Sequence, residues 1–445
     1  MTDAAIERPW VPSDIQEFHD RHARAYRHFD AAGFRSEVDR LVAAHERFMD
    51  RDCICLYAGT NIVSPRVARL QASTVGSRPS LGYPGDKYET GMRHAEQLEV
   101  LAVEILRRIF RCQYVEYRVG SGSLANLYAY MACTRPGDRI MALPDTAAGH
   151  VTHHEAGAAG LYGLEVHDVP WDAAAMTVDL PALEQDVRRL QPRLIIVGAS
   201  LALFPYPVRE VRRIADSVGA FVMFDAAHLS GLIAGGEFQQ PLAEGAHLMT
   251  CSTYKSFGGP AGGLVLTDSA ALAERLDRIA YPGLTANFDL GRTAALVAAA
   301  ADVLEYGRAY AGTCIANAQM LARHLAAEGC PVVARTGGGF TMSHHVAIRA
   351  DRYGGGTRAA RRLEEANILA GGIGLPGPPV AADYNGLRLG TQEITRWGML
   401  PDDMAQIARL LCRVLVDHEG TEQVRRDVLS FRERFQQLHF VRGEV

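Results

Sequence analysis

The sequence predicts an α/β fold in which a large domain built on a mostly parallel sheet precedes a smaller α+β domain. From about residue 95 onward, short apolar runs alternate with amphipathic helical segments. This alternation is typical of parallel strands joined by helices that cover both faces of the sheet. The composition, 48% apolar and 22% charged, is that of a globular protein with a large core.

Each element is predicted from its own pattern of apolar spacing. Charged, periodic residues over 13–50 indicate one or two surface helices. The predicted helices beyond them occupy 94–110, 120–134, 183–191 and 208–219, with a long helix or a pair of helices over 291–329. The predicted strands occupy 139–144, 193–200, 220–228, 247–256 and 262–268.

We expect three parts in the chain, which are an N-terminal helical arm (1–45), a large domain (46–305) and a small C-terminal domain (306–445). In a parallel α/β sheet, ligands bind at the carboxyl ends of the strands. The polar residues at those predicted ends are Ser200, Asp225, His228 and Lys255.

Charge and composition exclude several classes of function. The net charge of −5, with no basic run, argues against a nucleic-acid partner. No apolar stretch reaches the ~20 residues of a membrane span, and the first residues do not have the order of a secretory signal. The eight cysteines are scattered, without zinc-site spacing, so no metal site is expected and buried thiols in a reducing cytoplasm are the better interpretation.

Two residues at neighbouring predicted strand ends suggest the chemistry. Taken alone, each residue has an ordinary structural explanation. Asp225 in FDAAH can be a helix cap, and Lys255 in STYKS can be an exposed lysine in a loop. Together, on strands that we expect to be neighbours, they are the pair that a pyridoxal phosphate enzyme needs. A buried lysine bonds the cofactor aldehyde, and a carboxylate keeps the ring nitrogen protonated.

Two further segments complete a possible cofactor cradle. GSGSLAN (120–126) places a Gly/Ser turn at a helix start, where free N–H groups and hydroxyls can hold a phosphate. His150 lies between this turn and Asp225 in the chain, and its imidazole could stack on the cofactor ring. Taken singly, the turn is a plain helix cap and the histidine a surface or core residue.

These segments resemble the serine hydroxymethyltransferase family of fold-type I pyridoxal phosphate enzymes, over residues 50–415. The matching stretches are NIVSPRV (61–67), GYPGDKY (82–88), GSGSLAN, GHVTH (149–153), LIIVGAS (194–200), REVRRIADSVGAFVMFDAAHLSGLIAGG (209–236), STYKSFGGPAGG (252–263) and NGLRLGTQEITRWGM (385–399). The resemblance implies a seven-stranded, mostly parallel sheet in the large domain. It also implies a homodimer, or a dimer of dimers, whose active site is shared between subunits.

The resemblance also assigns roles, residue by residue. Lys255 would bond the cofactor, Asp225 would pair with its ring nitrogen, His150 would stack on the ring and Thr253 would assist proton transfer. Phosphate would be bound by Ser121, Gly122 and Ser123, and the surroundings of the ring oxygen would include Ser200 and His228. Arg388, in the last matching stretch, would hold the substrate carboxylate as a bidentate donor, and Tyr88 and Glu89 would lie near the substrate.

The departures from the family lie on its folate side. The family's essential glutamate, in Y-A-E before G-Y-P-G, aligns with Leu81, which can neither donate nor accept a proton. A family tyrosine aligns with Glu89, and the family's S-E-N triplet reads Gly59, Thr60 and Asn61, so a serine that would contact substrate is lost. The residues that would hold an amino acid are all kept.

We therefore expect an aldolase or transaldolase that breaks and forms the Cα–Cβ bond of a β-hydroxy amino acid of the L-threonine or L-serine type through a glycyl quinonoid, without folate. Its partners would be a small amino acid and an aldehyde. Resemblance to threonine transaldolases is carried by 309–325 and 338–348. The alternatives are a folate-dependent or α-methylserine-type hydroxymethyltransferase, another pyridoxal phosphate reaction on the same scaffold, and a non-catalytic member of the family.

Overall fold

The computed structural model describes residues 8–443, which belong to two compact units, Met1–Cys53 and Ile54–Val445. The first unit contains the α-helices α1 (Ser13–Tyr26) and α2 (Ala31–Glu46) and the π-helix η1 (Arg47–Asp52). One or two helices were expected in this segment from its charged periodicity, and the structure has two. Residues 1–7 of the predicted arm lie outside the described residues, and the three-part division of the chain stays a prediction.

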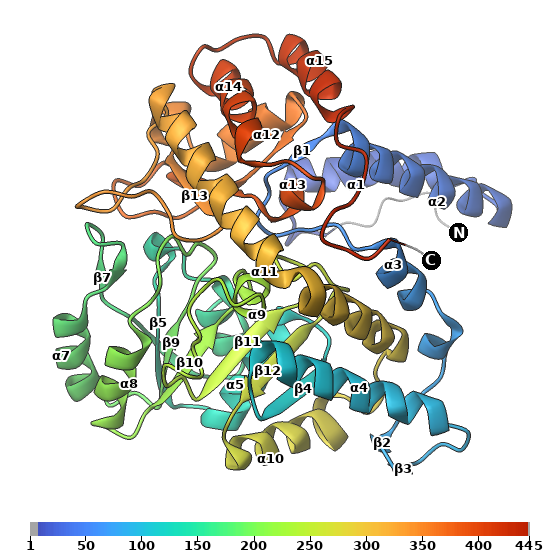
Figure 1. The fold of residues 1–445 in the computed structure, drawn as a ribbon, viewed down its shortest axis with the longest axis vertical. Coiled ribbons are helices and arrows are strands. Elements are labelled where there is room, and N and C mark those ends of the chain that lie inside the picture. The colour runs from blue at the N-terminus through green and yellow to red at the C-terminus, as the bar shows by residue number, and fades with distance from the viewer. Residues whose placement is uncertain (1–7, 444–445) are drawn as a thin grey trace. The chain divides into compact units, whose positions relative to one another are not determined.

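A seven-stranded sheet forms the centre of the second unit (Figure 1). Its strand order is β4-β12-β11-β10-β9-β5-β6. The antiparallel strand β12 separates β4 from the other five, which are parallel to one another. The bounds are β4 (Tyr114–Val119), β5 (Arg139–Ala142), β6 (Glu165–Asp168), β9 (Leu194–Val197), β10 (Phe221–Asp225), β11 (Leu248–Ser252) and β12 (Gly263–Thr267).

Alternate residues of each central strand pack on opposite faces of this sheet. In β9, Ile195 and Val197 join one apolar core, whereas Leu194 and Ile196 join another. Helices cover both faces, so the strands read as continuous apolar runs, as the sequence predicted. The predicted α/β fold class is confirmed.

The α-helices of the second unit are α3 (Pro65–Gln71), α4 (Arg93–Phe110), α5 (Gly122–Cys133), α6 (Ala158–Leu161), α7 (Leu180–Leu190), α8 (Val208–Asp216), α9 (Ser230–Ala234), α10 (Ala270–Arg278), α11 (Leu290–Ala327), α12 (Gly356–Glu365), α13 (Gln392–Arg396), α14 (Met404–Leu415) and α15 (Thr421–Arg432). The helices predicted in this unit agree with α4, α5, α7, α8 and α11 within a few residues, and the other helices of this unit were not predicted. The segment predicted as one long helix or a pair is the single helix α11, which packs against α3, α4 and α14.

The C-terminal part of this unit has its own small sheet and apolar core. The three antiparallel strands are ordered β13-β16-β15, and α12, α14 and α15 contribute to the same core (Figure 1). The bounds are β13 (His345–Arg349), β15 (Gly371–Ile373) and β16 (Gly386–Gly390). Shorter pairs complete the structure, with β1 (Ile54–Cys55) beside β14 (Ile368–Leu369), β2 (Gly82–Tyr83) beside β3 (Asp86–Lys87), and β7 (Trp171–Asp172) beside β8 (Thr177–Val178).

The central strands end earlier than predicted because their last residues turn. Strand β10 stops at Asp225, whose carboxylate accepts a hydrogen bond from Ala227 N. Strand β9 is followed by Gly198 at φ +98°, where a Cβ would collide with the backbone of Asp225. These turns place polar side chains at the carboxyl edge of the sheet.

Two further predictions concern the cysteines and membrane-spanning helices. All eight cysteines are buried free thiols, as the scattered spacing suggested. Within residues 8–443, no helix is both long and apolar enough to cross a membrane.

Candidate active site

A small cavity opens at the carboxyl edge of the seven-stranded sheet, with a volume of about 60 Å³. It collects the strand-end and turn residues that the sequence singled out. Its lining consists of Ser121, Gly122, Ser123, Asn126, His150, Ala199, Ser200, Asp225, Ala227, His228, Ser252, Tyr254 and Lys255. All the residues predicted to bind the cofactor are therefore brought together, although their individual roles stay predictions.

Asp225 is a buried carboxylate held by three donors. His153 Nε2 donates to its Oδ2 at 2.9 Å, Asn126 Nδ2 donates to the same oxygen at 3.0 Å, and Ala227 N donates to Oδ1 at 2.8 Å. Burial alone would raise the pKa of Asp225, but the hydrogen bond and charge of His153 and the Ala227 N–H outweigh it and hold that pKa below its usual range. Asp225 is therefore ionised at neutral pH.

Lys255 and Asp225 line the same cavity, since Asp225 ends β10 and Lys255 comes shortly after the adjacent parallel strand β11. The strand predicted over 247–256 ends at Ser252, and Lys255 lies in the turn that follows. Burial lowers the pKa of Lys255 to about 8, although the Asp225 charge opposes this shift. Near neutral pH a useful fraction of this amine is neutral and nucleophilic.

The imidazole of His228 lies between Lys255 and Arg388. Its Nδ1 lies 3.1 Å from the carbonyl oxygen of Ala58, which can only accept, so Nδ1 carries the proton. Nε2 is therefore the acceptor, 3.1 Å from Lys255 Nζ and 3.4 Å from Arg388 Nη1. Burial and the charges of Lys255 and Arg388 hold the pKa of His228 well below its usual range, so this imidazole stays neutral.

The N-terminus of α5 forms one wall of the cavity. Ser121 caps the helix and accepts a hydrogen bond from Leu124 N at 3.1 Å. A side chain at Gly122 would collide with Ser252 Oγ. Ser121, Gly122 and Ser123 at this helix start line the cavity, and the N-terminus of a helix is a site that can bind phosphate.

His150 and Arg388 occupy other sides of the same region. The His150 imidazole lies 2.8 Å from Thr152 Oγ1, and burial lowers the pKa of His150 to about 4, so the ring is neutral. Arg388 comes from β16, and its Nη1 donates to the carbonyl oxygen of Ser200. Burial lowers the pKa of Arg388 to about 10. Among residues 8–443, no carboxylate lies within ion-pair distance of Arg388.

Four predicted residues do not line this cavity, namely Arg388, described above, and Thr253, Tyr88 and Glu89. The Thr253 hydroxyl donates to the carbonyl oxygen of Pro260 at 2.5 Å, beside the lysine turn. Glu89 accepts a hydrogen bond from Leu81 N at 3.0 Å and borders a separate surface hollow. Tyr88 is 85% exposed. Their roles in catalysis or substrate binding stay predictions.

Sequence reasoning missed two groups that hold Asp225. His153 and Asn126 both contact its carboxylate, and Asn126 also accepts from Thr250 Oγ1 at 2.8 Å. A signal for each was present in the quoted motifs. His153 follows His150 by one helical turn in GHVTH, and Asn126 is the last residue of GSGSLAN.

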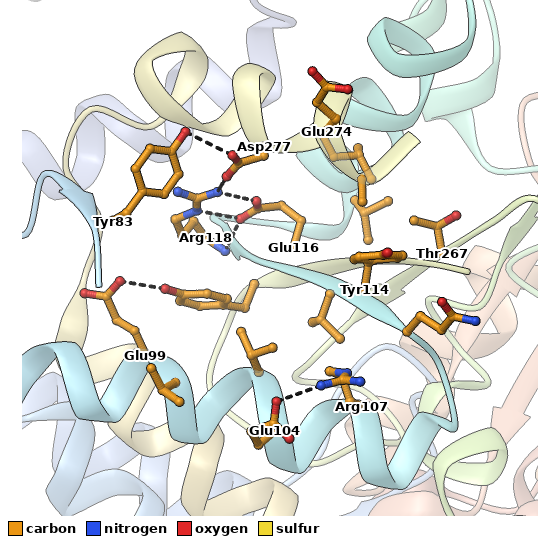
Figure 2. Close-up of a pocket in the computed structure, with 18 of the residues that line it drawn as sticks. Tyr83, Glu99, Glu104, Arg107, Tyr114, Glu116, Arg118, Thr267, Glu274 and Asp277 are labelled. Atoms are coloured by element: carbon orange, nitrogen blue, oxygen red, sulfur yellow. Dashed lines mark hydrogen bonds and ion pairs between the residues drawn. The ribbon is translucent and has the colours of Figure 1, made fainter. Parts of the chain in front are cut away.

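A larger groove of about 710 Å³ lies elsewhere, along β4 between α4 and α10 (Figure 2). Its charged groups are mostly paired with one another. Arg118 lies 2.7 Å from Glu116 and 2.6 Å from Asp277, and Glu104 lies 2.8 Å from Arg107 (Figure 2). The residues that line it include no lysine or histidine. We therefore assign the chemistry to the smaller cavity.

The residues of the smaller cavity fit pyridoxal phosphate. The fit rests on a buried lysine with a lowered pKa, a buried ionised carboxylate opposite it, and a helix start whose glycine leaves room for backbone donors. Lys255 would bond the aldehyde, Asp225 would pair with the ring nitrogen, and the turn from Ser121 to Ser123 would hold the phosphate.

Comparison with known proteins identifies the family. The family model of serine hydroxymethyltransferase matches residues 35–411. An α-methylserine aldolase from Ralstonia sp is 49% identical over 98% of this chain and 99% of that protein. One from Variovorax paradoxus is 50% identical over 99% of this chain and 100% of that protein. A serine hydroxymethyltransferase from Pyrococcus horikoshii is 40% identical over 92% of this chain and 96% of that protein.

A solved structure supports the fold. The structure of an L-threonine transaldolase from Pseudomonas fluorescens in its internal aldimine state superposes with a TM-score of 0.83 and 23% identity, over 97% of this chain and 96% of that one. The chain belongs to the serine hydroxymethyltransferase family, and it is an enzyme of that family with a fold-type I architecture. The predicted family is confirmed, and the family implies pyridoxal phosphate as its cofactor.

Proposed function

We propose that this enzyme is a folate-independent aldolase that cleaves and forms the Cα–Cβ bond of an α-substituted β-hydroxy amino acid, with α-methylserine as the leading substrate. The observation that carries the proposal is the combination of a complete amino-acid site with Leu81 at the position of the family's glutamate. The α-methylserine aldolases at 49% and 50% identity support this choice of substrate. The proposal combines two expectations from the sequence. The reaction is that of the folate-independent aldolase, and the substrate is that of the α-methylserine-type alternative.

The overall reaction is balanced without folate. Cleavage of α-methylserine breaks the Cα–Cβ bond, converts the β-hydroxymethyl group to formaldehyde and leaves alanine. One proton leaves the β-hydroxyl and one is added at Cα. Because the substrate has no hydrogen on Cα, proton removal from that carbon cannot compete with the cleavage.

Individual residues of this chain bind the substrate, stabilise charge and transfer the proton. Arg388, which has no carboxylate partner among the described residues, binds the substrate carboxylate. Pyridoxal phosphate, when bound, supplies a ring that withdraws the electron pair released at Cα. Asp225, held ionised by His153 and Asn126, stabilises positive charge on that ring nitrogen. Lys255, with a pKa of about 8, can take up and return a proton near neutral pH, and His228 Nε2 orients it.

The test is a product assay with purified holoenzyme and α-methyl-L-serine, L-serine or L-threonine, each with and without tetrahydrofolate. We expect formaldehyde and alanine in equal amounts from α-methylserine, at a rate that tetrahydrofolate does not change. Lys255→Ala is the control for uncatalysed cleavage. Formaldehyde transfer that requires tetrahydrofolate would instead indicate a hydroxymethyltransferase, and acetaldehyde from threonine as the main product would indicate a threonine-type aldolase or transaldolase.

A further inference from the structure

Tyr57 lies beside Arg388 in a slot between two glycines. The Arg388 Cζ is 5.9 Å from the centre of the Tyr57 ring. A Cβ at Gly59 would lie 2.7 Å from one ring edge, at Cε1, and a Cβ at Gly371 would lie 2.7 Å from the other, at Cε2. Gly371 is also the residue opposite Arg388 between β15 and β16. Both glycines are therefore needed for the ring to occupy this position.

The backbone of Tyr57 is anchored to the active site. Its carbonyl oxygen accepts hydrogen bonds from Gln392 Nε2 at 3.0 Å and from Thr60 N at 3.3 Å. The next carbonyl, that of Ala58, accepts the Nδ1–H of His228. The position of Tyr57 is thus fixed relative to both His228 and Arg388.

The hydroxyl of Tyr57 is available to a ligand. The side chain is 38% exposed, and within residues 8–443 no hydrogen bond to this hydroxyl is formed. The 5.9 Å between the ring centre and the Arg388 Cζ places the phenol near the guanidinium. A phenol O–H is a suitable second donor for a carboxylate that an arginine already binds.

We propose that Tyr57 is a second carboxylate-binding residue, whose hydroxyl donates to the substrate carboxylate held by Arg388 and whose ring shields one side of the guanidinium from water. It would replace the contact that the family's serine makes and that Gly59 cannot. The inference rests on the proposed function in one respect only, the assignment of a carboxylate ligand to Arg388. It makes Tyr57 a determinant of specificity for free amino acids over their amides.

Binding to the holoenzyme, measured by calorimetry, tests this role apart from catalysis. The ligands are L-alanine, L-alaninamide and propionate, a carboxylate without an amino group. We expect Tyr57→Phe to weaken L-alanine and propionate binding by a similar factor of about 10, the loss expected for one hydrogen bond to a charged group. The affinity for L-alaninamide should change much less. Gly371→Ala, which displaces the ring, should weaken the carboxylate ligands at least as much.

Tyr114→Phe is the matched control, since Tyr114 is 37% exposed and lies on β4 in the groove of Figure 2. It should leave all three affinities unchanged. Unchanged propionate binding in Tyr57→Phe, or an equal loss for alanine and alaninamide, would overturn the inference. If carboxylate binding depends on Tyr57 but α-methylserine is not cleaved, the proposed function fails and the role of Tyr57 stands.

Discussion

Lysine is rare in this chain, so the reactivity of the Lys255 amine can be compared with that of one other lysine. Its two lysines are Lys87 and Lys255. The side chain of Lys87 is buried, and its amine is occupied by an ion pair with Glu99 at 2.8 Å. Among the residues that the structure describes, no carboxylate lies at that distance from Lys255, and burial lowers the pKa of Lys255 to about 8. The two amines should therefore react very differently with an aldehyde.

We predict that pyridoxal phosphate added to the apoenzyme, followed by borohydride reduction, labels Lys255 and spares Lys87. The neutral amine is the reactive form, so a lowered pKa moves the onset of labelling down in pH. The initial rate should rise about tenfold per pH unit below pH 8 and level off above it. Peptide mapping by mass spectrometry measures the labelled site, with Lys87→Arg as the control. A midpoint near 10.5, or label at residue 87, would contradict the assignment.

At the same scale, the sequence predicted the two reacting groups, Asp225 and Lys255, better than the residues that hold Asp225 in position. Asp225 and Lys255 could be predicted because each follows a continuous apolar strand, where a charge is costly without a function. His153 and Asn126 could not be selected, since a histidine near a turn and an asparagine inside a helix have ordinary structural explanations. Only the three-dimensional structure shows that Asn126 on α5 and His153 in the turn Val151–His153 contact the same carboxylate.

At the scale of elements, the loop after β9 is held by the segment that leads into β13. Met342 N donates to the carbonyl oxygen of Leu203 at 2.7 Å, Ser343 Oγ donates to that of Ala202 at 2.5 Å, and Ala202 N donates to His345 Nδ1 at 3.2 Å. The same loop carries Ser200, whose carbonyl orients Arg388. No local sequence pattern links these segments, because they are about 140 residues apart.

We predict that Ser343→Ala destabilises this junction. Ser343 is fully buried, and its hydroxyl also accepts from His345 N at 3.1 Å, so the substitution leaves a buried carbonyl and a buried N–H without that partner. The free energy of unfolding should fall by about 1–3 kcal/mol, as measured by urea denaturation of the apoenzyme. Ser217→Ala is the control, since that hydroxyl contacts a carbonyl at a half-exposed helix end and its loss should cost about 0.5 kcal/mol or less. Equal effects of the two substitutions would refute the role of the junction.

At the scale of the whole molecule, the single chain leaves part of the predicted site unassembled. Glu89 borders a surface hollow built from residues 84–100, and Tyr88 beside it is 85% exposed. Neither residue lines the lysine cavity. The sequence could predict these residues only by resemblance, and the resemblance places the active site between two subunits. If they contact substrate, they must do so in a second copy of the chain.

A heterodimer test follows from this geometry. Tyr88→Ala should keep the fold, because the side chain is 85% exposed and forms no side-chain hydrogen bond within residues 8–443. If the phenol contacts substrate, the same substitution should lower kcat/KM about tenfold or more. Lys255→Ala should be inactive. The two variants, carrying different affinity tags, are co-expressed and the doubly tagged dimer is purified.

In that dimer, Lys255 from one copy and Tyr88 from the other can complete one site of the two, so about half of the wild-type activity should return. Activity no higher than that of the Tyr88→Ala variant would mean that Tyr88 acts within its own chain or not at all. Failure to isolate any doubly tagged species would contradict the homodimer itself. The outcome therefore decides whether the residues on the folate side of the family site belong to the partner subunit in this enzyme.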